Sequence, residues 1–175
     1  MYNLVLAISY IFSGFFMKYS DDEYDENNNK NKAIVLGIIC GFFAGLATIS
    51  NIDAAYIFIA ILIGNLLAFK IDGLHHIVTF FVFILMCLLF GVPSLSIVIL
   101  LICILSALFD EVGHELIGSA SDNNILALFF EYRFIMKIAI FLLAVLGVLN
   151  LWSFVFFILF EISYELAGYV FKNLF

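Results

Sequence analysis

Apolar and polar residues alternate along the chain in long blocks. Seven apolar runs, most of them about 16 residues long, are separated by short polar segments. A helix rises about 1.5 Å per residue, so runs of this length approach the thickness of the hydrocarbon part of a bilayer. Lipid cannot satisfy open backbone hydrogen bonds, and each run is therefore predicted to be a membrane helix. The predicted helices are 3–17, 33–49, 54–69, 77–92, 94–109, 134–149 and 151–171.

The connections between several of these runs are very short. Residues 50–53, residues 91–93 and the region of Asn150 leave so little chain that the flanking helices are expected to be antiparallel neighbours. Pro93, the only proline, marks the clearest break. The expected fold class is all-α: a polytopic transmembrane bundle of about seven helices that forms one integral membrane domain over residues 1–175.

Composition excludes two broad classes of protein. Hydrophobic residues make up 66% of the 175 positions and charged residues only 12%, with a mean hydropathy of +1.20. A soluble domain is nearer half apolar and one quarter charged, so too little polar surface remains here to cover a soluble core. The formal net charge is −7. A nucleic-acid partner would need a basic face, so none is expected.

The basic residues predict how the bundle is oriented. With seven crossings they all fall on one face of the membrane, at Lys18, Lys30, Lys32, Lys70, Arg133, Lys137 and Lys172. Basic residues favour the cytoplasmic side. The N-terminus is therefore predicted to lie outside and the C-terminus in the cytoplasm, with the chain as a multi-pass protein of the cell membrane. Among the acids between the runs, only Asp53 is predicted to lie outside.

Two polar segments are expected on the inner side. Residues 18–32 are predicted to form an inner loop, and residues 110–132 an interfacial or re-entrant segment. Within the latter, residues 116–132 are too short and too mixed in character to span the membrane. A helix that dips its apolar residues into the boundary is expected there.

A strip of small residues lies on one helix face. Gly37, Gly41 and Gly45 are four residues apart in the second run. Small residues at this spacing let two helix backbones approach closely. The strip therefore predicts packing against another helix.

Two carboxylates lie inside the last apolar run. Glu161 and Glu165 are four residues apart and so share a helix face. An ionised carboxylate within hydrocarbon is costly, so each is expected to be paired, protonated or bound to a cation. One interpretation is neutralisation by Lys137 or Arg133, and the other is a metal, proton or substrate site.

Two pairs have the spacing carboxylate-x-x-histidine. They are Asp72 with His75 and Glu111 with His114. Residues three apart on a helix project to the same side, so a carboxylate and an imidazole could bind one metal or neighbouring metals. Four-helix di-metal proteins combine two such pairs with single glutamates from other helices, which here would be Glu131, Glu161 or Glu165. His76 is interpreted as a lone interfacial histidine.

The sequence Asp21-Asp22-Glu23-Tyr24-Asp25 directly follows the first apolar run. Aspartates at this spacing can hold Mg²⁺, which prefers oxygen ligands and can neutralise a diphosphate. The arrangement resembles the first aspartate-rich motif of the intramembrane prenyltransferases. The resemblance covers these few residues and is one of site chemistry. It implies a second acidic motif on the same side, for which residues 110–115 would stand in. A solvated acidic loop is the alternative.

Together these features predict an inner-leaflet enzyme that acts on a lipid-linked phosphate or diphosphate, either polyprenyl or phospholipid. The cofactor is expected to be a divalent ion, Mg²⁺ first, with Zn²⁺, Mn²⁺ or iron as alternatives. The expected metal ligands are Asp21, Asp22, Asp25, Asp72, His75, Glu111, Glu115, Glu161 and Glu165. The expected phosphate-binding residues are Arg133, Lys137 and Lys70, and the expected catalytic residues are His114 and Asp110.

Two other functions remain open. The chain could be a cation or proton transporter that uses Glu161 and Glu165, or a non-catalytic subunit of a membrane complex. The outer halves of the runs offer few polar groups for a path across the membrane, which ranks transport second. A homo-oligomer is compatible with all three functions.

Overall fold

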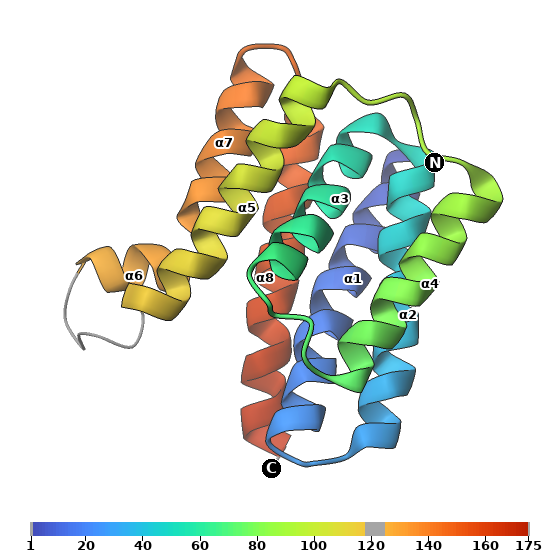
Figure 1. Cartoon of the computed structure of the whole chain (residues 1–175), viewed down its shortest axis with the longest axis vertical. Coiled ribbons are helices and arrows are strands. Elements are labelled where there is room, and N and C mark those ends of the chain that lie inside the picture. The colour runs from blue at the N-terminus through green and yellow to red at the C-terminus, as the bar shows by residue number, and fades with distance from the viewer. Residues whose placement is uncertain (1, 118–124, 175) are drawn as a thin grey trace.

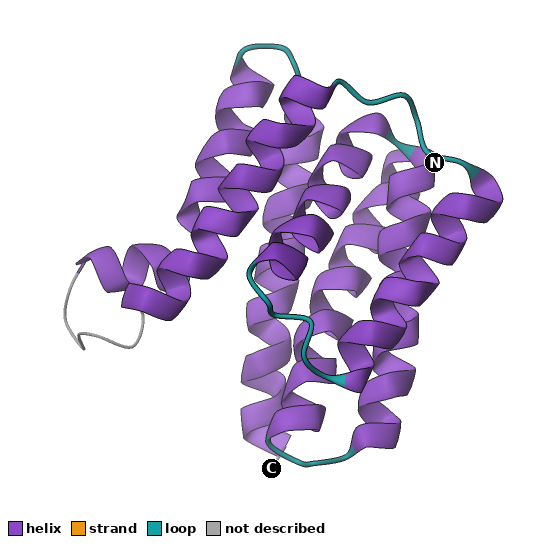
Figure 2. Ribbon diagram, in the orientation of Figure 1, coloured by secondary structure: helices purple, strands orange, loops and turns teal. Residues whose placement is uncertain are grey.

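The computed structural model describes residues 2–117 and 125–174, which form helices joined by short connections (Figure 1). The helices are α1 (Tyr2–Asp25), α2 (Lys30–Ser50), α3 (Ile52–Leu67), α4 (Leu74–Phe90), α5 (Ile97–Ile117), α6 (Ile125–Glu131), α7 (Phe134–Val145) and α8 (Leu151–Leu174). Figure 2 shows only helices and loops in these two ranges. The all-α prediction is therefore confirmed for the described residues. Each predicted run corresponds to one helix, and α6 is additional.

Several helices have the length and composition of membrane spans. In the described ranges, three are long and apolar enough to cross a membrane: α2, α5 and residues 151–173 of α8. Helices α3, α4 and α7 are also apolar but shorter. Large apolar side chains such as Leu88 and Ile97 are more than 70% exposed, as expected for lipid contact. These features indicate a membrane protein, whereas the seven crossings and their orientation stay predictions.

The polar segment 18–32 is mostly helical. Helix α1 continues past its apolar run to Asp25, and α2 begins after a connection of residues 26–29. Backbone hydrogen bonds in a helix do not require apolar side chains, so a polar sequence can prolong a helix beyond hydrocarbon. Across the connection, the buried carboxylate of Glu23 pairs with the ammonium group of Lys32.

The expected interfacial segment 110–132 is divided in the structure. Residues 110–117 are the end of α5, and α6 is a separate short helix after residues 118–124, which lie outside the described ranges. Helix α6 packs on α5 at Gly113, where an added Cβ would lie 2.0 Å from the ring of Phe130. Whether α6 is interfacial or re-entrant stays a prediction.

The helices pack as neighbours around α1, α3 and α8. Helix α1 lies between α2 and α8, and α4 packs on α2 (Figure 1). Helix α3 packs on α5 and α2, while α7 lies against α5 and α8. Part of the core is aromatic, with the ring of Phe58 4.8 Å from that of Tyr10 and 5.8 Å from that of Phe160.

The glycine strip on α2 faces α4. An added Cβ would lie 2.8 Å from the carbonyl oxygen of His75 at Gly37, and 2.6 Å from that of Thr79 at Gly41. At Gly45 it would lie 2.8 Å from Cβ of Met86. The predicted close packing is confirmed, with α4 as the partner. It fixes the first turns of α4 against α2.

A buried acid ties α3 to α8 where both helices begin. Oδ2 of Asp53 accepts a hydrogen bond from the backbone N–H of Asn150 at 2.8 Å and another from the hydroxyl of Ser153 at 2.7 Å. The residue is 7% exposed. The side chain of Asp53 therefore holds the starts of these two helices together.

Replacing Asp53 by alanine is expected to lower the free energy of unfolding by about 1–3 kcal/mol, because the buried hydroxyl of Ser153 and the part-buried N–H of Asn150 lose their acceptor. Asp53→Asn keeps one acceptor oxygen and should cost less. Thermal unfolding of the purified variants in detergent measures both effects. An alanine variant as stable as the parent chain would contradict this role.

Candidate functional site

A cavity of about 320 Å³ lies beside the end of α3. Helix α3 stops at Leu67, part-way along the bundle, and the connection 68–73 then leads to α4 (Figure 1). The walls of the cavity come from this connection, from Arg133 and from all the long helices. Residues from seven helices, many of them far apart in the sequence, thus meet around one space.

The cavity has one polar side and one apolar side. On α1, α4, α5 and α8, the polar lining residues lie toward the end of the bundle where α4 begins. The apolar lining residues include Ala44, Phe58, Leu62, Phe83, Ala107, Phe157 and Phe160. Such a space suits an amphiphilic ligand with a polar head and an apolar tail.

Most of the predicted site residues line this cavity. They are Asp21, Asp25, Lys70, Asp72, His75, Asp110, Glu111, His114, Arg133 and Glu161. In the described part of the chain, four predicted site residues are not part of its lining: Asp22, Glu115, Lys137 and Glu165.

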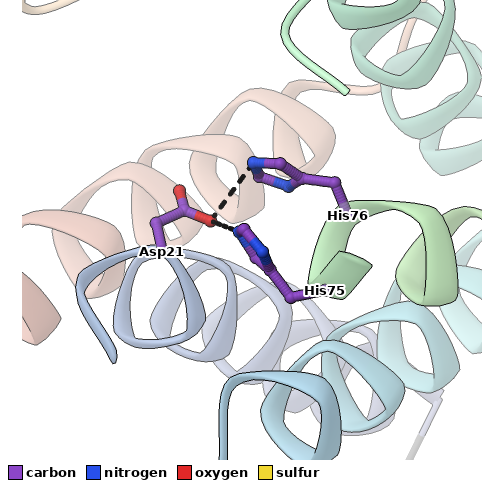
Figure 3. Close-up of side chains that lie close together, drawn as sticks. All are labelled: Asp21, His75 and His76. Atoms are coloured by element: carbon purple, nitrogen blue, oxygen red, sulfur yellow. Dashed lines mark hydrogen bonds and ion pairs between the residues drawn. The ribbon is translucent and has the colours of Figure 1, made fainter. Parts of the chain in front are cut away.

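Asp21 of α1 and the adjacent His75 and His76 of α4 form a compact group (Figure 3). Oδ1 of Asp21 lies 3.2 Å from Nε2 of His75 and 3.7 Å from Nε2 of His76. The potential ligand atoms of the three residues all lie within 4.8 Å of one another. Oδ1 of Asp72 is 3.9 Å from Nε2 of His76. Three side chains thus direct ligand atoms of the kinds that bind metals toward one point.

The imidazole of His75 is held by close packing. It is 2% exposed, and its ring lies 4.3 Å from the ring of Tyr24. An added Cβ at Gly73 would lie 2.5 Å from Cε1 and Nδ1 of His75. Nδ1 is buried, and among the described residues it has no hydrogen-bond partner. The position of Nε2 is therefore set by the ring packing.

The sequence pattern did not identify His76 as a site residue. Asp72 was paired with His75 on the assumption of one continuous helix, but α4 begins only at Leu74. Asp72 lies instead near His76, and the acid beside His75 comes from α1. Two adjacent histidines at the start of an apolar run were the sequence feature that could have indicated His76 as a site residue.

Arg133 lies between α6 and α7. Its Nε is 2.9 Å from Oε1 of Glu111, and its guanidinium carbon is 5.4 Å from the centroid of the Tyr164 ring. Burial lowers the pKa of Arg133, but the neighbouring Tyr164 and Glu111 raise it by more, so the net shift is upward. The side chain therefore keeps its positive charge at the cavity.

Asp110 supports the start of α7. Its two carboxylate oxygens accept hydrogen bonds from the backbone N–H groups of Ile135 at 2.9 Å and Met136 at 2.7 Å. The first N–H groups of a helix have no partner within that helix, and an acid satisfies them well. Because both oxygens are engaged, we expect Asp110 to support α7 and not to act in catalysis.

The two carboxylates of the last run, Glu161 and Glu165, lie in different surroundings. Oε2 of Glu161 forms an ion pair with Nζ of Lys137 at 2.8 Å, which is the neutralised arrangement considered above. Glu165, in contrast, is exposed. Two other predicted ligands also have basic partners: Asp22 lies 2.8 Å from Lys18, and the exposed Glu115 lies 3.5 Å from Lys70.

Comparisons with known protein families, with curated proteins and with solved structures found no match to this chain.

Proposed function

We propose that this protein is an integral membrane enzyme that needs a divalent metal and acts on a lipid-linked phosphate or diphosphate. One observation carries the proposal: a single cavity joins carboxylates, imidazoles and an arginine to apolar walls. A lipid phosphate has the matching chemistry, with an anionic head next to a hydrocarbon tail. The volume of about 320 Å³ is at the lower end for small-molecule sites. It would hold the head and the first part of the tail.

The lining residues divide into roles. Arg133 and Lys70 would bind the phosphate oxygens, because a guanidinium matches their geometry and an ammonium adds charge. His114 would transfer a proton to or from the reacting oxygen. The carboxylate and imidazole groups of α1 and α4 would hold the metal. The bound ion would supply Lewis acidity to the phosphoryl oxygens.

The setting in the membrane belongs to the same proposal. Seven crossings with the basic residues in the cytoplasm would place the cavity in the inner leaflet. A lipid head would then meet the polar side of the cavity at its own depth, while its tail stays among apolar side chains.

The two rival functions make different use of the acids. Transport would need a continuous polar path, yet Glu161 is paired with Lys137, and Glu165 is exposed and is not part of the cavity lining. Near the start of α8, Oδ2 of Asp53 accepts hydrogen bonds from Asn150 and Ser153. These contacts favour the enzyme. A non-catalytic subunit would have no need for an amphipathic cavity.

Removal of divalent metal is expected to abolish turnover. The purified protein would be incubated in mixed micelles with polyprenyl diphosphate, polyprenyl phosphate or phosphatidic acid, and release or transfer of phosphate would be followed. EDTA should lower the rate at least about a thousandfold, because metal activation of a phosphoryl group contributes several kcal/mol. Added metal should restore it. Metal-dependent ion flux into liposomes without turnover of any of the three lipids would contradict the proposal and favour transport.

A further inference from the structure

We propose that Asp21, His75 and His76 form a binding site for a transition metal of the zinc class. The inference deepens the proposed function: it rests on that function for the catalytic use of the ion, but not for the binding itself. It changes the expected cofactor from Mg²⁺ to Zn²⁺ and adds His76, which the sequence pattern did not single out, to the ligands.

The two distances from Asp21 to the histidines are close to those around one small ion, and all three ligand atoms lie within 4.8 Å of one another. Zinc binds histidine nitrogen and carboxylate oxygen at about 2.0–2.1 Å in a tetrahedron, so two such ligands lie about 3.3–3.4 Å apart. The observed separations from Oδ1 of Asp21 are 3.2 Å to Nε2 of His75 and 3.7 Å to Nε2 of His76. These values lie on either side of the tetrahedral edge. Small rotations of the half-exposed side chains of Asp21 and His76 would complete the geometry.

The kinds of ligand select the metal. Mg²⁺ takes oxygen ligands almost exclusively, whereas imidazole suits Zn²⁺ and its neighbours in the transition series. Two imidazoles and one carboxylate therefore disfavour Mg²⁺. The aspartates of α1 offer no competing cluster, because Asp22 is paired with Lys18 at 2.8 Å.

The site is built before an ion arrives. The glycine strip of α2 fixes the start of α4, and the hydroxyl of Thr79 donates a hydrogen bond to the carbonyl of Gly37 at 3.0 Å. Gly73 and Tyr24 then position the ring of His75. The two elements that supply the ligands, α1 and α4, both pack on α2. Fixed supports of this kind raise metal affinity, because little has to be ordered on binding.

One coordination position remains for a substrate atom. Three protein ligands with an open fourth position are typical of catalytic zinc sites. All three residues line the cavity. A phosphate oxygen or a water molecule in that cavity could therefore complete the tetrahedron.

The test measures metal binding by the full-length protein in detergent. The chain would be stripped with chelator, loaded with Zn²⁺ and desalted, and the bound metal would be counted by elemental analysis. Visible absorption after loading with Co²⁺ reports whether the site is tetrahedral. We expect about one ion per chain for the parent protein, and the intense spectrum of a tetrahedral centre. Excess Mg²⁺ should not displace the ion.

The variants separate these ligands from their surroundings. His75→Ala and Asp21→Asn should weaken Zn²⁺ binding at least tenfold. His75 is buried, so its replacement could disturb folding. The side chain of His76 is 28% exposed, which makes His76→Gln the safer variant. His76→Gln should weaken Zn²⁺ binding to the same extent. His114→Ala removes the remaining histidine of the same cavity and should leave the Zn²⁺ affinity unchanged. Gly73→Ala keeps every ligand but displaces the ring of His75, and it should also weaken binding.

Failure of the site and failure of the proposed function give different results. Undiminished Zn²⁺ binding by a folded His76→Gln protein would overturn the site, even if lipid turnover remains metal-dependent. One Zn²⁺ per chain, lost in that variant, would support the site, even if no lipid phosphate is turned over. Displacement of Zn²⁺ by Mg²⁺ at equal concentration would also overturn it.

Discussion

Replacing Arg133 by glutamine is expected to lower kcat/KM for a lipid phosphate by about 10²–10³-fold. The guanidinium is a permanent charge at the cavity, and loss of one such group that stabilises developing charge typically costs this much. Most of the effect should fall on kcat if Arg133 contacts the oxygens of the reacting phosphate. Steady-state kinetics in mixed micelles would measure it.

A paired variant controls for damage to the fold. Arg133→Gln alone leaves the carboxylate of Glu111 without its 2.9 Å partner, so this variant should also be less stable. The double variant Arg133→Gln/Glu111→Gln removes both charges and should recover stability but not turnover. Lys172→Gln, which removes an exposed base at the end of α8, should change neither quantity. Full activity in the double variant would show that Arg133 matters only through Glu111.

Replacing Asp110 by alanine is expected to lower the free energy of unfolding by about 2–6 kcal/mol. Two backbone N–H groups at the start of α7 lose their acceptors, and each loss costs about 1–3 kcal/mol. The buried position leaves little access for water to replace them. Thermal or chemical unfolding in detergent, followed by circular dichroism, would measure the change.

Asp110→Asn distinguishes support from catalysis. The amide keeps one acceptor, so the asparagine variant should be less stable than the parent but more stable than the alanine variant. Its turnover per folded molecule should stay within a fewfold of that of the parent. Abolished turnover in a stable Asp110→Asn protein would return this residue to the catalytic group.

The helices were predictable because their cause is local. Each apolar run is a block of sequence, and a chain in lipid has little choice but to form a helix there. The ends were less predictable. The apolar pattern stops at Met17, but α1 continues to Asp25 because its own backbone and the pairing of Glu23 with Lys32 support a polar extension.

The residues that line the cavity were partly predictable from the sequence, whereas the contacts between their side chains were not. That the polar residues gather on one side was predicted from the order of the runs and the positions of the bases. Which carboxylate meets which imidazole depends on the rotation of each helix, which periodicity does not fix. Asp21 and His75 are 54 residues apart and meet because α1 and α4 both pack on α2 and also contact each other.

Asp110 and Asp53 also have contacts that the sequence pattern could not predict. Asp110 looked catalytic because it lies beside Glu111 and His114 in sequence. Its orientation toward the backbone of α7 depends on a chain reversal some 25 residues later. Asp53 was expected only to lie outside, and its contacts with Asn150 and Ser153 join residues about 100 positions apart.

The shortness of α3 has a consequence for how a substrate would arrive. With 16 residues the helix spans about 24 Å, less than the roughly 30 Å of hydrocarbon in a typical bilayer. The polar side of the cavity begins where α3 ends, so in the proposed membrane setting it would lie a short distance below the phospholipid headgroups. A lipid could reach it by lateral diffusion at constant depth, with its phosphate hydrated until the last step. Bilayer thickness would thereby become a determinant of the reaction rate, because a thicker membrane draws the headgroups away from Arg133.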